Sequence, residues 1–257
     1  MIGFSNIGKL GRSQHNTDLF VGVVRNIHAV ARSDNPNAEK DDENYQVARS
    51  QFITDTIATY EGTQVPTCKE CTIEMSEGFH VHHADGDHTN NKPSNFEINC
   101  PFCHLTKHLG WVGANGLGIM IYAPNIPQAT LNQIQIACYA HEYILNETSR
   151  NTKYYSHLKQ QAHYLSVYLQ SLESTKAVIQ RDFKTTDPLH FANAFVQMSE
   201  DEYASRATGT FSGIRLLFDH TQFQTEIEKY AKYSLSMDDP TSQNHPAQWL
   251  AQAKQII

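Results

Sequence analysis

The chain has 257 residues, which is long enough to bury a sizeable core, and 40% of them are hydrophobic and 18% charged, as in ordinary globular domains. No apolar run reaches the eighteen residues that a membrane span needs, and the first residues lack the apolar core of a signal peptide, so we expect a cytoplasmic protein. The net charge is −7, and residues 61–110 carry three lysines against seven carboxylates. This local excess of negative charge counts against a nucleic-acid-binding surface in that region.

The first sixty residues are expected to form an N-terminal arm that is helical in part. Residues 33–44 (SDNPNAEKDDEN) are polar and acidic, a composition typical of a linker. A linker at this position predicts that the first thirty residues are only loosely attached to the rest of the chain.

Four of the five cysteines form two C-x-x-C pairs, Cys68 with Cys71 and Cys100 with Cys103, and 28 residues separate the pairs. Each pair lets two thiolates approach one ion from a tight turn, and two such pairs complete the tetrahedral shell of a structural zinc. Disulfide bonds are the alternative, and they fit poorly in a chain without a secretory signal. Cys138 stands alone in an apolar helical pattern and is expected to be a small buried core residue.

Six of the fourteen histidines lie between and just after the cysteine pairs. HVHH alternates like the end of a strand, ADGD and TNNKPSN are loops by composition, and CHLTKH begins a helix. On that helix His104 and His108 are one turn apart, and His82 faces them from the strand. Neutral imidazoles in this arrangement suit a divalent transition metal, and a hydrogen-bonded cluster without a second metal is the alternative. His80 and His88 are interpreted as surface or turn residues.

Beyond the histidines the sequence predicts one short strand and a series of helices. Four glycines between residues 110 and 118 are expected to end the helix that begins at His104, and the apolar run 119–122 predicts the strand. Helices are predicted from Pro127, along an apolar stripe from Leu158 to Ile179, from Asp187-Pro188, from the capping box Ser199 to Glu202, over 221–233 and over 246–257. The stripe suits either the core or a partner-binding seam, and we favour the core.

The stretch VHHADGD…NKPSNFEINCPFCH…H resembles the HNH, or ββα-metal, endonuclease motif, flanked by the zinc knuckle found in many members. Eight residues separate Asn95 from His104, and three separate His104 from His108. The resemblance implies that His83 is a general base and that Asn95 pins the loop that orients it. It further implies that His82, His104 and His108 hold a second divalent ion, Mg²⁺, Mn²⁺, Ni²⁺ or Zn²⁺, as phosphodiester hydrolysis requires. The same skeleton also serves as an inactive scaffold.

Longer stretches are similar to the IcmJ (DotN) family, subunits of the coupling complex in type IVB (Dot/Icm) secretion and related conjugation systems. CHLTKHLGWVGANGLGIMIYAPNIPQATLNQI, DPLHFANAFVQMSEDEYASR…GIRLL and AQWLAQAK carry this similarity, which extends over about 190 residues from Cys68 onward. The resemblance implies an α+β chain: a small HNH-like ββα zinc module at 61–110, then a mainly α-helical domain at 111–257 that docks on the coupling ATPase. It also implies a position peripheral to an inner-membrane secretion complex.

Two functions of different classes follow from these patterns. The first is a zinc-binding adaptor subunit, whose metal site stiffens a platform for the coupling ATPase. The second is an active, divalent-metal-dependent DNA endonuclease with His83 as its base. The acidic surroundings of the histidines favour the adaptor.

Overall fold

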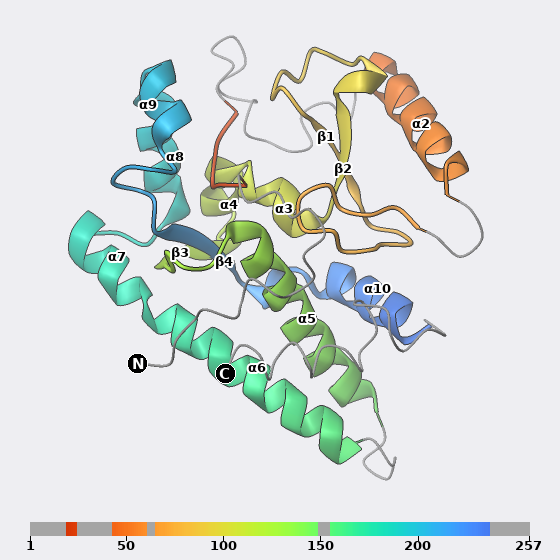
Figure 1. Cartoon of the computed structure of the whole chain (residues 1–257), viewed down its shortest axis with the longest axis vertical. Helices are drawn as coiled ribbons and strands as arrows, with labels where there is room; N and C mark the ends of the chain where they lie inside the picture. The colour runs from red at the N-terminus through yellow and green to blue at the C-terminus, as the bar shows by residue number, and fades with distance from the viewer. Residues whose placement is uncertain (1–18, 25–42, 61–64, 149–154, 237–257) are drawn as a thin grey trace.

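The computed structural model describes residues 19–24, 43–60, 65–148 and 155–236. Within these ranges helices and two short antiparallel strand pairs make a mixed α+β fold, as expected (Figure 1). The predicted helix at 246–257 lies outside the described residues, as does the predicted linker at 33–44 except for its last two residues. None of the helices in the described ranges has the length and apolar character needed to cross a bilayer.

The first strand pair carries the histidines. β1 (His80–His83) pairs with β2 (Phe96–Asn99) in antiparallel register, with His83 opposite Phe96, and the short 3-10 helix η2 (Pro93–Asn95) leads into β2. α3 (Pro101–Thr106) follows directly, with Cys100 as its N-cap and Pro101 in its first turn. The predicted order of strand, loop and helix is therefore confirmed, and β2 is a second strand before the helix, as a ββα module would have.

The second strand pair lies among the remaining helices. β3 (Gly118–Tyr122) pairs antiparallel with β4 (Ile214–Phe218), and all five residues of β4 are buried. The other elements are α5 (Gln128–Glu147), α6 (Tyr155–Ser174), α7 (Lys176–Phe183), α8 (Pro188–Gln197), α9 (Glu200–Ser205), η3 (His220–Gln222) and α10 (Gln224–Leu235). One hydrophobic cluster takes residues from both sides of position 110, so the expected division into two parts stays a prediction.

Several local signals are confirmed. The strand at 119–122 and the helix after Pro127 form as predicted, and Ser199 and Glu202 make a complete capping box at α9. Leu165, Leu169, Leu172 and Ile179 of the apolar stripe are buried, which confirms the core interpretation. No strand was predicted at β4, because a short apolar run without alternation does not distinguish a buried strand from a buried helix.

The glycines after His108 do not end the helix, and that expectation is wrong. α4 (Leu109–Ala114) contains Gly110 and Gly113, and the break falls earlier, between α3 and α4. A Cβ at Gly113 would lie 2.2 Å from the backbone nitrogen of Leu189 at the start of α8. Glycine at this position therefore lets α4 and α8 approach closely rather than terminating a helix.

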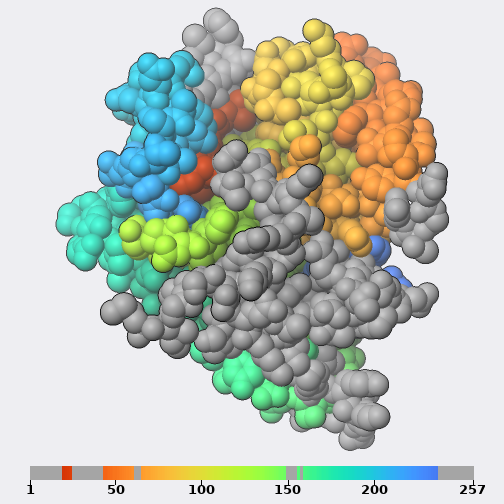
Figure 2. Space-filling model, viewed as in Figure 1, coloured from red at the N-terminus to blue at the C-terminus, as the bar shows by residue number. Residues whose placement is uncertain are grey.

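The expectation of a loosely attached arm is wrong for residues 19–24. Five of these six side chains are apolar and buried, and the segment lies between α9 and the part of the chain that carries the histidines (Figure 2). The Gly22 N–H donates to Thr106 O at 3.0 Å, and Gly22 O accepts from Leu109 N at 2.9 Å. In a continuous helix Thr106 O and Leu109 N would form hydrogen bonds within the helix. Here both bond to Gly22 instead, so the inserted segment stabilises the break between α3 and α4.

The helix in the rest of the described arm packs on a second, smaller hydrophobic cluster. α2 (Glu43–Ala58) lies beside β1 and β2, with Tyr45 and Phe52 edge-on to Phe96 at centroid distances of 6.0 and 5.6 Å (Figure 1). Tyr45 also stacks on His83 at 5.6 Å. The helical part of the predicted arm therefore packs on the histidine-bearing strands.

Candidate metal centres

The four paired cysteines come together in one group. Their sulfur atoms all lie within 4.8 Å of one another, all four side chains are buried, and none forms a disulfide. Cys68 and Cys71 lie in a turn stabilised by the bond from Thr72 N to Cys68 O at 2.9 Å, with Thr72 in the left-handed region at φ 59°. Cys100 and Cys103 lie at the start of α3, where the Cys103 N–H donates to Cys100 Sγ at 3.3 Å. Two tight turns therefore present four sulfurs to one point.

Burial and mutual hydrogen bonds shift the pKa values of these four thiols. Burial raises the pKa of Cys71 and Cys103 well above the usual thiol value, and it raises the pKa of Cys100. Burial also acts to raise the pKa of Cys68, but hydrogen bonds from the other three thiols outweigh it and leave that pKa well below the usual value. A divalent cation among the sulfurs would stabilise the thiolate form of all four.

The donor set fits zinc. Four sulfur donors in a closed, buried group are the ligands of a structural zinc site, whereas carboxylates and carbonyls suit Mg²⁺ and Ca²⁺. The Asn132 amide on α5 donates to Cys103 Sγ at 3.3 Å and to Thr106 Oγ1 at 3.2 Å. This support was not predicted, since nothing in the local sequence around Asn132 marks a contact 29 residues away.

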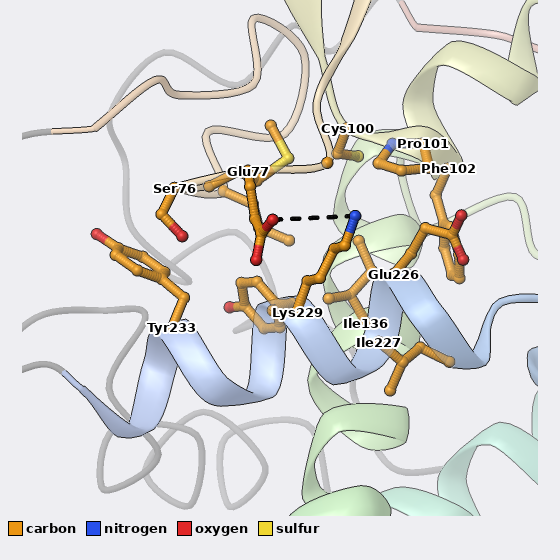
Figure 3. A pocket seen from close by; sticks show the side chains of 14 residues that line it. Ser76, Glu77, Cys100, Pro101, Phe102, Ile136, Glu226, Ile227, Lys229 and Tyr233 are labelled. Atoms are coloured by element: carbon orange, nitrogen blue, oxygen red, sulfur yellow. Dashed lines mark ion pairs between the residues drawn. The ribbon is translucent and has the colours of Figure 1, made fainter.

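α10 closes the Cys100 side of the group (Figure 3). Lys229 extends from α10 toward Glu77, with 4.0 Å between Nζ and Oε2, and the Tyr233 hydroxyl donates to Glu74 Oε2 at 3.1 Å. The cavity left between α10 and residues 73–78 is about 30 Å³, room for about one water molecule. This wall is therefore packed and covers the sulfurs from solvent.

The predicted metal-binding histidines also come together. One ring nitrogen from each of His82, His104 and His108 lies within 4.8 Å of the others, and all three side chains are buried. His104 Nε2 lies 3.2 Å from His108 Nε2, and His82 Nδ1 is buried without a hydrogen-bond partner in the described part of the chain. The ion pair of Lys107 with the buried Glu70, at 2.6 Å, ties the first cysteine turn to the junction of α3 and α4. The two candidate centres are adjacent, since Cys103 and His104 are neighbours on α3.

Three of the clustered histidines, His80, His82 and His104, have lowered pKa values. Burial, with smaller contributions from Lys107 and neighbouring histidines, lowers the pKa of His82 and His104 well below the usual value. Burial also lowers the pKa of His80 to about 4. A neutral imidazole is the form that binds a metal, so these rings are ready to act as ligands at neutral pH.

His80 and His88 both approach this cluster. The interpretation as a surface or turn residue is wrong for His80, which lies in β1, whereas His88 lies in a turn as expected. His80 Nδ1 lies 2.8 Å from His104 Nδ1, and the His88 ring lies 5.1 Å from that of His83 and 5.7 Å from that of His108. The spacing of His80 from His82 could have revealed the first contact, because residues two apart in a strand share a face. No comparable local signal points to His88.

His83 and Asn95, the predicted base and its support, lie at the loop between the strands. His83 is buried, and its Nε2 lies 3.0 Å from Asn91 Oδ1. The Asn95 amide donates to Asp85 Oδ1 at 2.8 Å and to Asn90 O at 3.0 Å, while its oxygen accepts from Asp85 N at 3.1 Å. Asn95 therefore ties the loop together, while its predicted role in orienting a general base stays a prediction.

A cleft of about 600 Å³ opens beside His82, between residues 84–87, segment 19–24 and α9. Its charged lining residues are Glu70, Asp85, Asp87, Glu200, Lys107 and Arg206. Lys107 is engaged by Glu70, and Arg206 donates to Val21 O at 3.0 Å with its guanidinium 3.8 Å from the centre of the Tyr203 ring. The cations of this cleft are thus committed to internal contacts, which disfavours binding of a phosphate backbone there.

The fold and the cysteine group together define a mixed α+β protein with a buried four-cysteine group able to hold a metal ion. No model of a protein family matches the chain. The chain is similar to a curated protein, the type 4 apparatus protein DotN of Legionella pneumophila: the two are 28% identical over 174 residues, 66% of this chain and 74% of DotN. This similarity supports the relationship to the IcmJ (DotN) family that the sequence motifs indicate.

Proposed function

We propose that the protein is a zinc-binding adaptor subunit of a type IVB secretion or conjugation coupling complex, and that it binds the coupling ATPase. The similarity to a type 4 apparatus protein over most of both chains is the main support. The proposal includes a cytoplasmic location, peripheral to the inner-membrane complex, which follows from the same family resemblance.

The buried cysteine group gives the proposal its physical basis. Zinc bound to Cys68, Cys71, Cys100 and Cys103 would contribute folding free energy directly, because the ligands converge only in the folded chain. The segments that it would join are short, namely a turn, a two-stranded pair and a six-residue helix. A metal-stabilised platform of this kind suits an adaptor, whose task is to hold a surface in one shape.

The test compares two buried cysteines. Cys71→Ala removes one proposed zinc ligand, whereas Cys138→Ala truncates a buried cysteine on α5 outside the group. Under the proposal Cys71→Ala loses both zinc and co-purification with the coupling ATPase, while Cys138→Ala and His83→Ala retain both. A folded His83→Ala protein that binds the ATPase yet abolishes secretion or transfer would refute a purely adaptor role.

An active HNH-type DNA endonuclease is the alternative, because the histidine arrangement supports it. A divalent ion at His82, His104 and His108 would stabilise negative charge on a phosphate, and His83 would take the proton from the attacking water. The test is nicking of supercoiled plasmid with Mg²⁺, Mn²⁺, Ni²⁺ or Zn²⁺. Nicking that His83→Ala abolishes would favour the alternative. Its absence under all four ions, or its persistence in His83→Ala, would exclude it.

A further inference from the structure

His104 lies at the centre of the histidine cluster, with a different histidine at each of its two ring nitrogens. On one side His104 Nδ1 is 2.8 Å from His80 Nδ1, and on the other His104 Nε2 is 3.2 Å from His108 Nε2. The ring centroids lie 4.9 and 4.6 Å away, and both neighbouring rings are nearly perpendicular to that of His104. The tautomer of His104 is therefore linked to both neighbours.

A neutral His104 ring carries one proton, so the nitrogen that holds it determines which nitrogen can bind a metal. A neutral imidazole carries one N–H, and the nitrogen that binds a metal must present its lone pair instead. If His104 Nε2 faces an ion shared with His82 and His108, its proton must be on Nδ1. The Nδ1 of His80 is then the atom that accepts this hydrogen bond, and the proton of His80 is on its own Nε2.

Burial makes this acceptor necessary. His104 has an exposed fraction of 4%, so solvent does not readily reach its Nδ1, and a buried N–H without an acceptor is destabilising. His80 lies at the start of β1 opposite Asn99, on the same strand face as His82. The strand that supplies one proposed ligand thus also supplies the hydrogen-bond acceptor for another.

We propose that His80 is a positioning residue that accepts the Nδ1–H of His104 and thereby directs His104 Nε2 toward a divalent ion. Metal-binding histidines commonly donate their other N–H to a carboxylate or a carbonyl, and here a second imidazole takes that role. The proposal rests on the histidine metal site described above and adds to it a residue that is not itself a ligand.

Two substitutions distinguish the effect of losing the hydrogen-bond acceptor of His80 from the effect of losing its aromatic ring. His80→Phe keeps an aromatic ring and removes the acceptor, whereas His80→Asn removes the ring and keeps an acceptor, because Asn Oδ1 lies two bonds from Cβ like Nδ1 of histidine. His163→Asn, at an exposed position on α6, is the matched control. Each variant is used as the full chain with its cysteine group loaded with zinc, and a further equivalent of Zn²⁺ is titrated calorimetrically.

We expect the unsubstituted chain to bind a second Zn²⁺ and His80→Phe to bind it about 10–100-fold more weakly, with His80→Asn within a few fold of the parent. Two-bond ¹⁵N–¹H spectra of the loaded parent should show the proton of His104 on Nδ1. A loaded parent with the proton on Nε2, or equal affinity of His80→Phe and the parent, overturns the role of His80 while the metal site stands. A parent that binds no second ion overturns both, and the adaptor function is unaffected.

Discussion

Gly113→Ala offers a test of the packing that positions α4, the helix whose N-cap is His108. The added methyl group would lie 2.2 Å from Leu189 N and 2.7 Å from Leu189 Cα, and both atoms are backbone. To restore an ordinary contact distance of about 3.4 Å, α8 would have to move by about 1.2 Å. No side-chain rotation relieves the contact, so the two helices must separate.

The expected change in the free energy of unfolding of Gly113→Ala follows from two opposing contributions. Alanine is favoured over glycine inside a helix by about 1 kcal/mol, whereas forcing a methyl group into a packed interface costs about 1–3 kcal/mol and more when backbone must move. Because the contact is with backbone, we expect the second contribution to exceed the first, with a net loss of about 2 kcal/mol. For a chain of this size that corresponds to a fall in Tm of about 4–8 °C.

The assay is urea unfolding followed by circular dichroism, together with a thermal scan. Gly209→Ala is the matched control, because a Cβ there meets nothing within 4 Å, and we expect its stability to stay within about 0.5 kcal/mol of the parent. If Gly113→Ala proved as stable as the parent or more stable, the close approach of α4 and α8 would be refuted. Loss of stability in both variants would show that the contact with Leu189 is not its specific cause.

Three further predictions concern the cysteine group, the Tyr203 hydroxyl and the buried histidines. Cys71→Ala should lose the zinc ion held by the cysteine group, so that the zinc content falls by one ion per chain, and should abolish cooperative unfolding, as measured by elemental analysis and calorimetry; a fully folded variant that lacks this ion would contradict the four-cysteine site. Tyr203→Phe should cost about 1–2 kcal/mol in urea unfolding, since its hydroxyl bonds to both backbone groups of one residue in segment 19–24, and an unchanged midpoint would argue against that anchoring. The pKa of His80 is about 4 in the folded chain and that of His104 is well below its usual value, so their contribution to stability should be complete above about pH 6.5 and decline as the pH falls, with that of His80 lost toward pH 4. The urea midpoint should therefore fall over this range, and less steeply in His80→Phe; parallel curves for the two proteins would count against the burial of His80.

Local signals in the sequence predicted many of the elements correctly. The C-x-x-C spacing places two thiols in one turn, Ser199 and Glu202 cap each other within α9, and the alternation of HVHH marks β1. In each case the atoms that interact are separated by a few residues, so the pattern of residue types is enough to specify the geometry. Convergence of the two cysteine pairs could also be anticipated, because four thiols with this spacing share one coordination preference.

The sequence by itself thus determined the kinds of ligand, the caps and the apolar faces, while contacts between distant residues decided how the candidate site is assembled. Segment 19–24 enters the core because Gly22 bonds to Thr106 and Leu109, and this insertion divides the helix that carries His104 from the one that begins after His108. His80 joins the cluster because His104 approaches it from a helix 24 positions away. Hydrogen bonds and packing between such remote groups depend on the arrangement of the whole chain, and the two-residue spacing of His80 and His82 indicates a shared strand face without specifying the partner.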